Sequence, residues 1–138
     1  MTIVSEHRLR NDPGEARQVG AWVEAFARQA GLSAEVQNAL DLSLVEWVTN
    51  LVSHAYEDER EHTITLRFKA EPAEVCVEVE DDGKEFNPLL HPPADTTAPL
   101  ETRPIGGLGI YMMRKLVDAV EYQRTNGRNM LTLRKRLT

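Results

Sequence analysis

Three short groups of residues in this chain combine polar chemistry with regular spacing. The first is Glu46, Asn50 and His54, which recur at every fourth position. The second is the run Asp81-Asp82-Gly83, and the third is the glycine-rich run Gly106-Gly107-Leu108-Gly109. Together they would supply an oxygen ligand for a hard metal ion, a buried carboxylate for a base, and bare backbone amides for phosphate.

Glu46, Asn50 and His54 would form a polar stripe on a helix, because residues four apart are displaced by only about 40°. Asparagine is a poor helix former, so Asn50 beside an apolar face needs a reason. One reason is Mg²⁺, for which one amide oxygen and phosphate oxygens suffice. Glu46, one turn away, would then take a proton from an attacking hydroxyl or water. The alternative is a solvent-facing polar stripe with no chemical role.

The run Asp81-Asp82-Gly83 ends a stretch of alternating apolar residues. One of the two carboxylates would accept a hydrogen bond from the exocyclic amine of a purine, a contact that rejects bases without that donor. The alternative is a plain turn, because Asp-Gly is a common turn signal.

The glycine-rich run at 106–109 precedes a predicted helix. Glycine allows close approach to a phosphate, and free amides at a helix N-terminus favour an anion. No Gly-Lys-Ser/Thr follows, so the run is not a Walker A loop. A loop-to-helix junction without a ligand is the alternative. The segment before it, residues 87–105, is rich in proline and favours a lid that closes over a ligand.

Helices and strands alternate in a way that predicts an α+β fold with a largely antiparallel sheet. The pattern predicts an edge strand at 2–9 with Ile3 facing inward, and a pair of alternating strands at 63–68 and 75–80. A closing hairpin is predicted at 120–124 and 130–134, with Asn126-Gly127 as its turn.

Three helices are predicted from periodicity and caps. The first starts at Asp12-Pro13 and ends at Gly31, the second is capped by Ser33, and the third runs from Ile110 to Val120.

Length and composition predict one globular domain, residues 1–138. The formal net charge of −6 argues against nucleic acid as a partner. No stretch is long and apolar enough to span a membrane, and the N-terminus has no apolar leader. The lone Cys76 is predicted to be buried and inert. These features predict a soluble cytoplasmic protein.

The three groups occur in the order of the N, G1 and G2 boxes of the GHKL ATPase superfamily. The chain resembles the anti-sigma-factor serine kinases of bacterial partner-switching systems, the RsbW/SpoIIAB type, over nearly its full length. The resemblance is carried by residues 46–56, 81–88 and 106–110, with the closing hairpin at 122–137. It implies a Bergerat two-layer sandwich, with a mostly antiparallel sheet covered by three helices and an ATP lid at about 87–105.

The resemblance also implies roles for single residues and names ATP and Mg²⁺ as cofactors. Asn50 would ligate Mg²⁺, and Glu46 would be the general base. The adenine amine would be held by Asp81, helped by Gly83 and Thr132. Gly107, Leu108 and Gly109, in the glycine turn that starts at Gly106, would present backbone amides to the phosphates. The lid residue Arg103 would compensate charge near the phosphates, and His54 would be a further cofactor-binding residue.

Similar proteins phosphorylate a serine on a STAS-domain anti-anti-sigma factor, and many sequester a sigma factor. A homodimer is left open. The alternative function is a nucleotide-gated anti-sigma or binding protein without kinase turnover, and a degenerate domain without nucleotide is a third. One departure is Glu85, which stands where the G1 box has its last glycine, so its Cβ conflicts with any backbone conformation that needs a positive φ.

Overall fold

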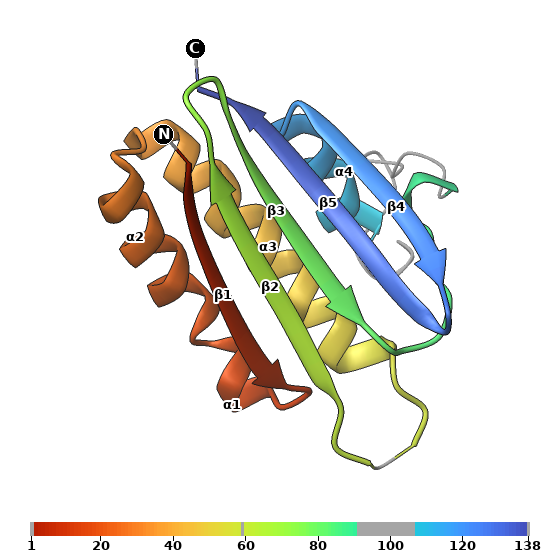
Figure 1. The fold of residues 1–138 in the computed structure, drawn as a ribbon. Coiled ribbons are helices and arrows are strands. Elements are labelled where there is room, and N and C mark those ends of the chain that lie inside the picture. The colour runs from red at the N-terminus through yellow and green to blue at the C-terminus, as the bar shows by residue number, and fades with distance from the viewer. Residues whose placement is uncertain (1, 59, 91–106, 138) are drawn as a thin grey trace.

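The computed structural model describes residues 2–58, 60–90 and 107–137. Its five strands form one sheet in the order β1-β2-β3-β5-β4, and every neighbouring pair is antiparallel (Figure 1). The strands are β1 (Ile3–Arg10), β2 (Thr63–Ala70), β3 (Glu74–Asp81), β4 (Ala119–Thr125) and β5 (Arg128–Arg136). The predicted antiparallel sheet is therefore confirmed.

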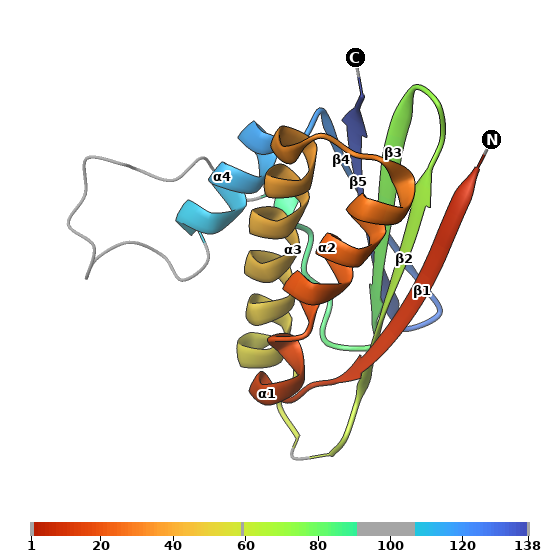
Figure 2. The ribbon, with the colours of Figure 1, turned by 90° about the vertical axis from the view of Figure 1, so that its left-hand side faces the viewer.

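The helices cover one face of this sheet and leave the other face bare of described helices (Figure 2). The three long ones are α2 (Val19–Ala30), α3 (Ala34–His54) and α4 (Gly107–Leu116), accompanied by the single turn α1 (Pro13–Ala16) and the 3-10 turn η1 (Pro88–Leu90). This is the two-layer α+β sandwich that the sequence predicts. No described helix has the length and apolar character needed to cross a membrane.

The core lies between α3 and the middle of the sheet. On β3 every second residue points inward, and Val75, Val77 and Val79 are fully buried. Leu40 and Leu44 on α3 are buried to the same degree and meet them from the helical layer. Removing these apolar surfaces from water is the main force that holds α3 against the sheet, and α3 in turn carries Glu46, Asn50 and His54.

The caps predicted for the helices are present, but the first helix is interrupted. Ser33 Oγ accepts a hydrogen bond from the Val36 amide at 3.2 Å, and Gly31 ends α2 with a left-handed φ of 68°. Asp12 caps only the single turn α1, which buries no residue. A continuous helix from Asp12 is therefore wrong: the apolar repeat that ties a helix to the core starts only at Val19.

Near the C-terminus, the structure changes one predicted helix boundary and confirms the predicted hairpin. The helix predicted to reach Val120 ends at Leu116, whereas Val120 lies in β4 opposite Leu133, as the predicted hairpin strand at 120–124 has it. The hairpin between β4 and β5 is confirmed, with positive φ angles of 53° at Asn126 and 75° at Gly127. Two positive φ angles in succession are what a tight two-residue hairpin turn requires.

Cys76 lies on the bare face of the sheet, where it is half-buried rather than buried as predicted. Its β3 position alternates with the inward valines, so its side chain faces the outer surface. Burial still raises the pKa of the thiol.

Candidate nucleotide-binding site

A cavity of about 220 Å³ opens beside the C-terminal half of α3. Its walls come from α3, the turn after β3, the first residues of α4 and the start of β5. The lining residues are Trp47, Asn50, Leu51, His54, Ala55, Lys84, Phe86, Ile110 and Asn129. Mostly apolar walls with a few convergent polar groups are typical of a site for a small organic ligand.

Asp81, at the end of β3, is fully buried and is hydrogen-bonded to Asn129, which lines this cavity. Its Oδ2 accepts hydrogen bonds from the Gly83 amide at 2.8 Å and from Asn129 Nδ2 at 3.0 Å. Its Oδ1 is buried and has no hydrogen-bond partner among the described residues. A buried acceptor left without a donor is costly, so it points to a ligand that brings one.

The pKa of Asp81 reflects two opposed effects. Burial raises the pKa of the carboxyl, and the hydrogen bonds from Asn129 and Gly83 lower it. The carboxylate is thus stabilised by its neighbours in an environment that disfavours charge.

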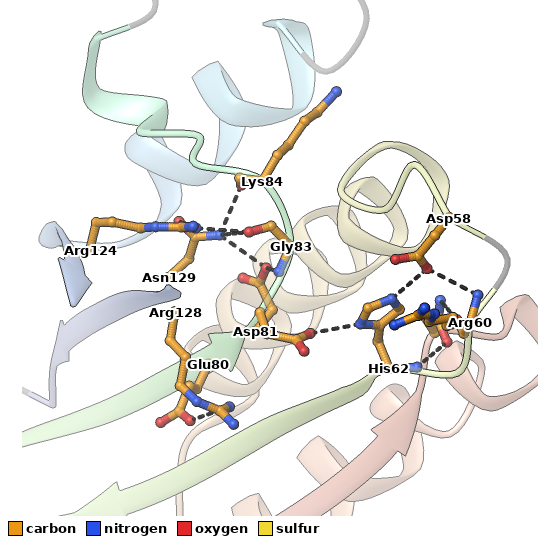
Figure 3. Close-up of polar contacts among 12 residues, drawn as sticks. Asp58, Arg60, His62, Glu80, Asp81, Gly83, Lys84, Arg124, Arg128 and Asn129 are labelled. Carbon is orange, nitrogen blue, oxygen red and sulfur yellow. Dashed lines mark hydrogen bonds and ion pairs between the residues drawn. The ribbon is translucent and has the colours of Figure 1, made fainter. Parts of the chain in front are cut away.

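Gly83 allows the turn after β3 to pack against the end of α3. A Cβ at this position would lie 2.7 Å from Ala55 Cβ and 2.8 Å from the Ala55 carbonyl oxygen. That carbonyl accepts a hydrogen bond from the Lys84 amide at 3.0 Å. This close contact fixes the turn that follows Asp81, and Figure 3 shows Asp81 next to Gly83 and Asn129.

Asn129 on β5 is a site residue that the sequence reasoning missed. It is 3% exposed, lines the cavity and donates to Asp81 (Figure 3). Thr132, the predicted partner of Asp81, lies opposite Glu78 and Glu121 and is not brought to the cavity. The apolar alternation of β5 carries the signal, because Asn129 shares its parity with the buried Leu131 and Leu133, whereas Thr132 has the opposite parity.

The predicted stripe on α3 leads from the cavity toward α4. Asn50 and His54 line the cavity, and Asn50 Nδ2 donates to Glu46 Oε1 at 3.2 Å. The amide nitrogen therefore faces Glu46, and no described residue donates a hydrogen bond to Asn50 Oδ1. That oxygen is the atom available to a cation. His54 is exposed and Glu46 is half-buried.

Gly109 lies directly on Glu46. A Cβ built on Gly109 would come 1.8 Å from Glu46 Oε1, a separation that only a glycine permits. The structure thus places Gly109, the last residue of the glycine-rich run, in direct contact with the candidate base Glu46. The order of the motifs in the sequence does not by itself require this contact. Gly107 and Leu108 form the start of α4, where the first amides of a helix have no partner within it.

The remaining predicted features fall partly outside the described residues. Arg103, Gly106 and most of the lid predicted at 87–105 lie outside them. In the part of the chain that is described, no three histidine, cysteine or acidic side chains form a metal site. A magnesium ion would therefore rely on Asn50 and on oxygens of its own ligand, which suits an ion that keeps several waters.

Glu85 does not disturb the turn. It is exposed, and the described non-glycine residue with a positive φ is Asn126. Because the backbone at Glu85 avoids the left-handed region, a Cβ is tolerated where the family box has glycine.

Comparison with known proteins gives the family. Residues 9–135 match the histidine kinase-like ATPase domain. The chain is 33% identical over 114 residues to serine/threonine-protein kinase BtrW of Bordetella bronchiseptica, covering 81% of this chain and 79% of that protein. It is 29% identical over 109 residues to serine-protein kinase RsbW of Listeria monocytogenes, covering 76% of this chain and 69% of that protein.

Solved structures agree on the fold. The RsbU and RsbW domains of a Mycobacterium tuberculosis protein superpose with a TM-score of 0.67 at 19% identity, over 98% of this chain and 32% of that chain. The histidine kinase domain of a blue-light activated histidine kinase from Erythrobacter litoralis superposes with a TM-score of 0.58 at 19% identity. The match covers 88% of this chain and 60% of that chain. The chain therefore belongs to the histidine kinase-like ATPase domain family, and its relatives there include serine-protein kinases of the RsbW type.

Proposed function

We propose that this chain is an ATP-dependent protein-serine kinase of a bacterial partner-switching system. The observation that carries the proposal is the direct contact between Glu46 and Gly109, near a cavity whose lining residue Asn129 is hydrogen-bonded to the buried Asp81. Each of these three residues adjoins a residue that lines the cavity: Glu46 is hydrogen-bonded to Asn50, Gly109 precedes Ile110, and Asp81 is hydrogen-bonded to Asn129. The serine-protein kinase names of the relatives support the reaction class.

The cavity would take the adenine base of ATP. Asp81 Oδ1 would accept a hydrogen bond from the exocyclic amine, which supplies the donor that this buried oxygen lacks among the described residues. Trp47, Leu51 and Ile110 line the cavity and would pack against the base. The amides of the first turn of α4 would bind the phosphates.

Glu46 would act as the general base. Bound ATP with Mg²⁺ supplies the phosphoryl group and neutralises charge as that group is transferred. Glu46 would receive the proton of the serine hydroxyl, and the hydrogen bond from Asn50 Nδ2 would hold its carboxylate in place. Asn50 Oδ1 would be the protein ligand for Mg²⁺.

The proposed substrate is a serine of a STAS-domain anti-anti-sigma factor, and a sigma factor or another regulator is the proposed downstream partner. The RsbW names of the relatives and the RsbU–RsbW domain structure support this assignment. A homodimer and a cytoplasmic location remain predictions from the sequence.

The proposal is tested by incubating the chain with γ-labelled ATP, Mg²⁺ and a STAS-domain protein from the same genome. We expect label on a partner serine, identified by mass spectrometry, and its loss with Asn50→Ala. Asn38→Ala, an exposed substitution on the same helix, is the matched control. Tight ATP binding and a stable complex without label would contradict the kinase and favour a nucleotide-gated binding protein.

A further inference from the structure

Asn129 sits at the centre of a polar network behind Asp81 (Figure 3). Its Nδ2 group donates to Asp81 Oδ2 at 3.0 Å and to the carbonyl of Lys84 at 3.0 Å. Its Oδ1 accepts from Arg124 at 3.0 Å and from the Tyr122 hydroxyl. Arg124 donates also to the Gly83 carbonyl at 2.8 Å, so the network joins β4, β5 and the turn after β3.

We propose that Asn129, held by Arg124 and Tyr122, is a positioning residue that leaves Asp81 Oδ1 as a bare acceptor and thereby makes the cavity select purines with an exocyclic amine. The inference rests on the proposed nucleotide binding and adds the residues that set its specificity.

The network fixes the orientation of the Asn129 amide. Its nitrogen faces acceptors that cannot donate, Asp81 Oδ2 and the Lys84 carbonyl, while its oxygen faces Arg124 and Tyr122. A flipped amide would set oxygen against oxygen and nitrogen against the Arg124 guanidinium. The donor to Asp81 is therefore held in place by groups on a different strand.

Asn129 also decides which carboxylate oxygen meets the ligand. Asp81 Oδ2 already accepts two hydrogen bonds, from Asn129 and from the Gly83 amide. A proton on Asp81 would consequently go to Oδ1, and that oxygen would become a donor. An ionised Asp81 prefers a base edge with an amine, whereas a protonated one prefers a carbonyl.

The balance between ionised and protonated Asp81 depends on Asn129. Burial raises the pKa of Asp81, and the hydrogen bond from Asn129 is the largest influence that lowers it. The nearby carboxylate of Asp82 raises this pKa, the Arg124 guanidinium lowers it, and the Tyr56 hydroxyl also lies within electrostatic reach of Asp81. Loss of the Asn129 donor would move the protonation of Asp81 toward neutral pH and weaken discrimination against a carbonyl-bearing base.

The test compares ATP with ITP, which carries a carbonyl in place of the amine, by measuring the affinity of the full chain for each between pH 5 and pH 9. We expect the wild type to prefer ATP by at least about tenfold, because a hydrogen bond to a charged group is at stake. Asn129→Asp, of the same shape but without the donor, should lower this preference at least about tenfold. It should also shift the pH at which ATP affinity falls upward by about one unit or more.

Two further variants keep the result interpretable. Asn38→Asp makes the same chemical change at an exposed position of α3 and should leave preference and pH profile unchanged. Tyr122→Phe removes one donor to Asn129 Oδ1. It should lower the preference for ATP over ITP and raise the pH at which ATP affinity falls, each by less than Asn129→Asp does. If Asn129→Asp fails to fold, Tyr122→Phe tests the role of Asn129 alone.

The outcomes separate this inference from the proposed function. A wild type that binds neither nucleotide would overturn both. A wild type that binds ATP and ITP equally, or an Asn129→Asp or Tyr122→Phe variant that keeps the wild-type preference and pH profile, would overturn the role of Asn129 and leave ATP binding standing.

Discussion

At the scale of single residues, Gly109 controls the position of Glu46. A Cβ at Gly109 would overlap Glu46 Oε1, Cδ and Cγ, which are all side-chain atoms, so the Glu46 side chain should rotate away while the helix stays. Gly109→Ala should therefore keep the thermal stability, since alanine favours a helix. It should slow phosphoryl transfer by about tenfold to a hundredfold, because a misplaced catalytic group is costly. Thermal unfolding and transfer of labelled phosphate are the two measurements, and an unchanged transfer rate would contradict the assignment.

Gly83 should respond differently to the same substitution. Its Cβ would meet the Ala55 carbonyl oxygen at 2.8 Å, and a backbone atom cannot rotate away. We expect Gly83→Ala to lower the free energy of unfolding by about 1–3 kcal/mol, as measured by urea denaturation. Gly20→Ala is the control, because its Cβ would meet only Asp41 Oδ1 at 3.3 Å. Equal stability of the two variants would contradict the tight packing at Gly83.

The residues of the candidate site differ in how far the sequence predicts them. The types and spacing of Asn50, His54 and Gly83 identify them as candidates. Asn50 and His54 line the cavity, and Gly83 packs against Ala55, which also lines it. Asn129 does not, because its role depends on the pairing of β5 with β3, which places it directly opposite Asp81. The contact between Gly109 and Glu46 likewise depends on how α4 packs on α3, and no local pattern encodes it.

At the scale of elements, His62 joins the segment after α3 to the turn after β3. Its Nε2 lies 2.7 Å from Asp58 Oδ1, and its Nδ1 lies 3.1 Å from Asp82 Oδ1. Its ring stacks on Tyr56 with centroids 4.3 Å apart. The hydrogen bond with Asp58, followed by that with Asp82, raises the pKa of His62 above its usual 6.5, although partial burial opposes this.

This pKa shift predicts how stability depends on pH. A raised folded-state pKa gives stability that is fully present below about 6.5 and is lost as pH rises through the folded value. The wild type should therefore have a higher free energy of unfolding than His62→Gln at pH 6, and this difference should shrink as pH is raised to 9. Urea unfolding at each pH measures it. Asn38→Gln, at an exposed and uncharged position of α3, should show no such trend. An advantage over His62→Gln that stays constant with pH would refute the ion-pair account.

Elements whose residues repeat at a clear period are predicted well, and boundaries are predicted poorly. The alternation on β3 and the Asn126-Gly127 turn each determine local structure, and both are confirmed. The break between α1 and α2 is not visible locally, since Asp12 and Pro13 are good helix-starting residues. It arises because only the segment from Val19 onward is buried against the core.

At the scale of the whole molecule, nucleotide binding should stabilise the fold. ATP with Mg²⁺ at a hundredfold excess over its Kd should add about 2.7 kcal/mol to the free energy of unfolding. Asp81→Asn should lose most of this effect, because its side chain no longer offers a charged acceptor. The chain has two tryptophans, and Trp47 lines the cavity, so a Trp22→Phe variant would report binding through Trp47 fluorescence. An undiminished stabilisation of Asp81→Asn would contradict the role of Asp81.

The most direct test of the central claim compares ATP affinity and phosphoryl transfer for the wild type and Glu46→Gln in the same preparation. Glu35→Gln, at an exposed position near the start of α3, is the control. We predict that Glu46→Gln binds ATP as the wild type does and transfers phosphate to a partner serine about 10²- to 10⁴-fold more slowly. Transfer by Glu46→Gln at the wild-type rate would contradict the claim that the contact between α3 and α4 forms a catalytic centre.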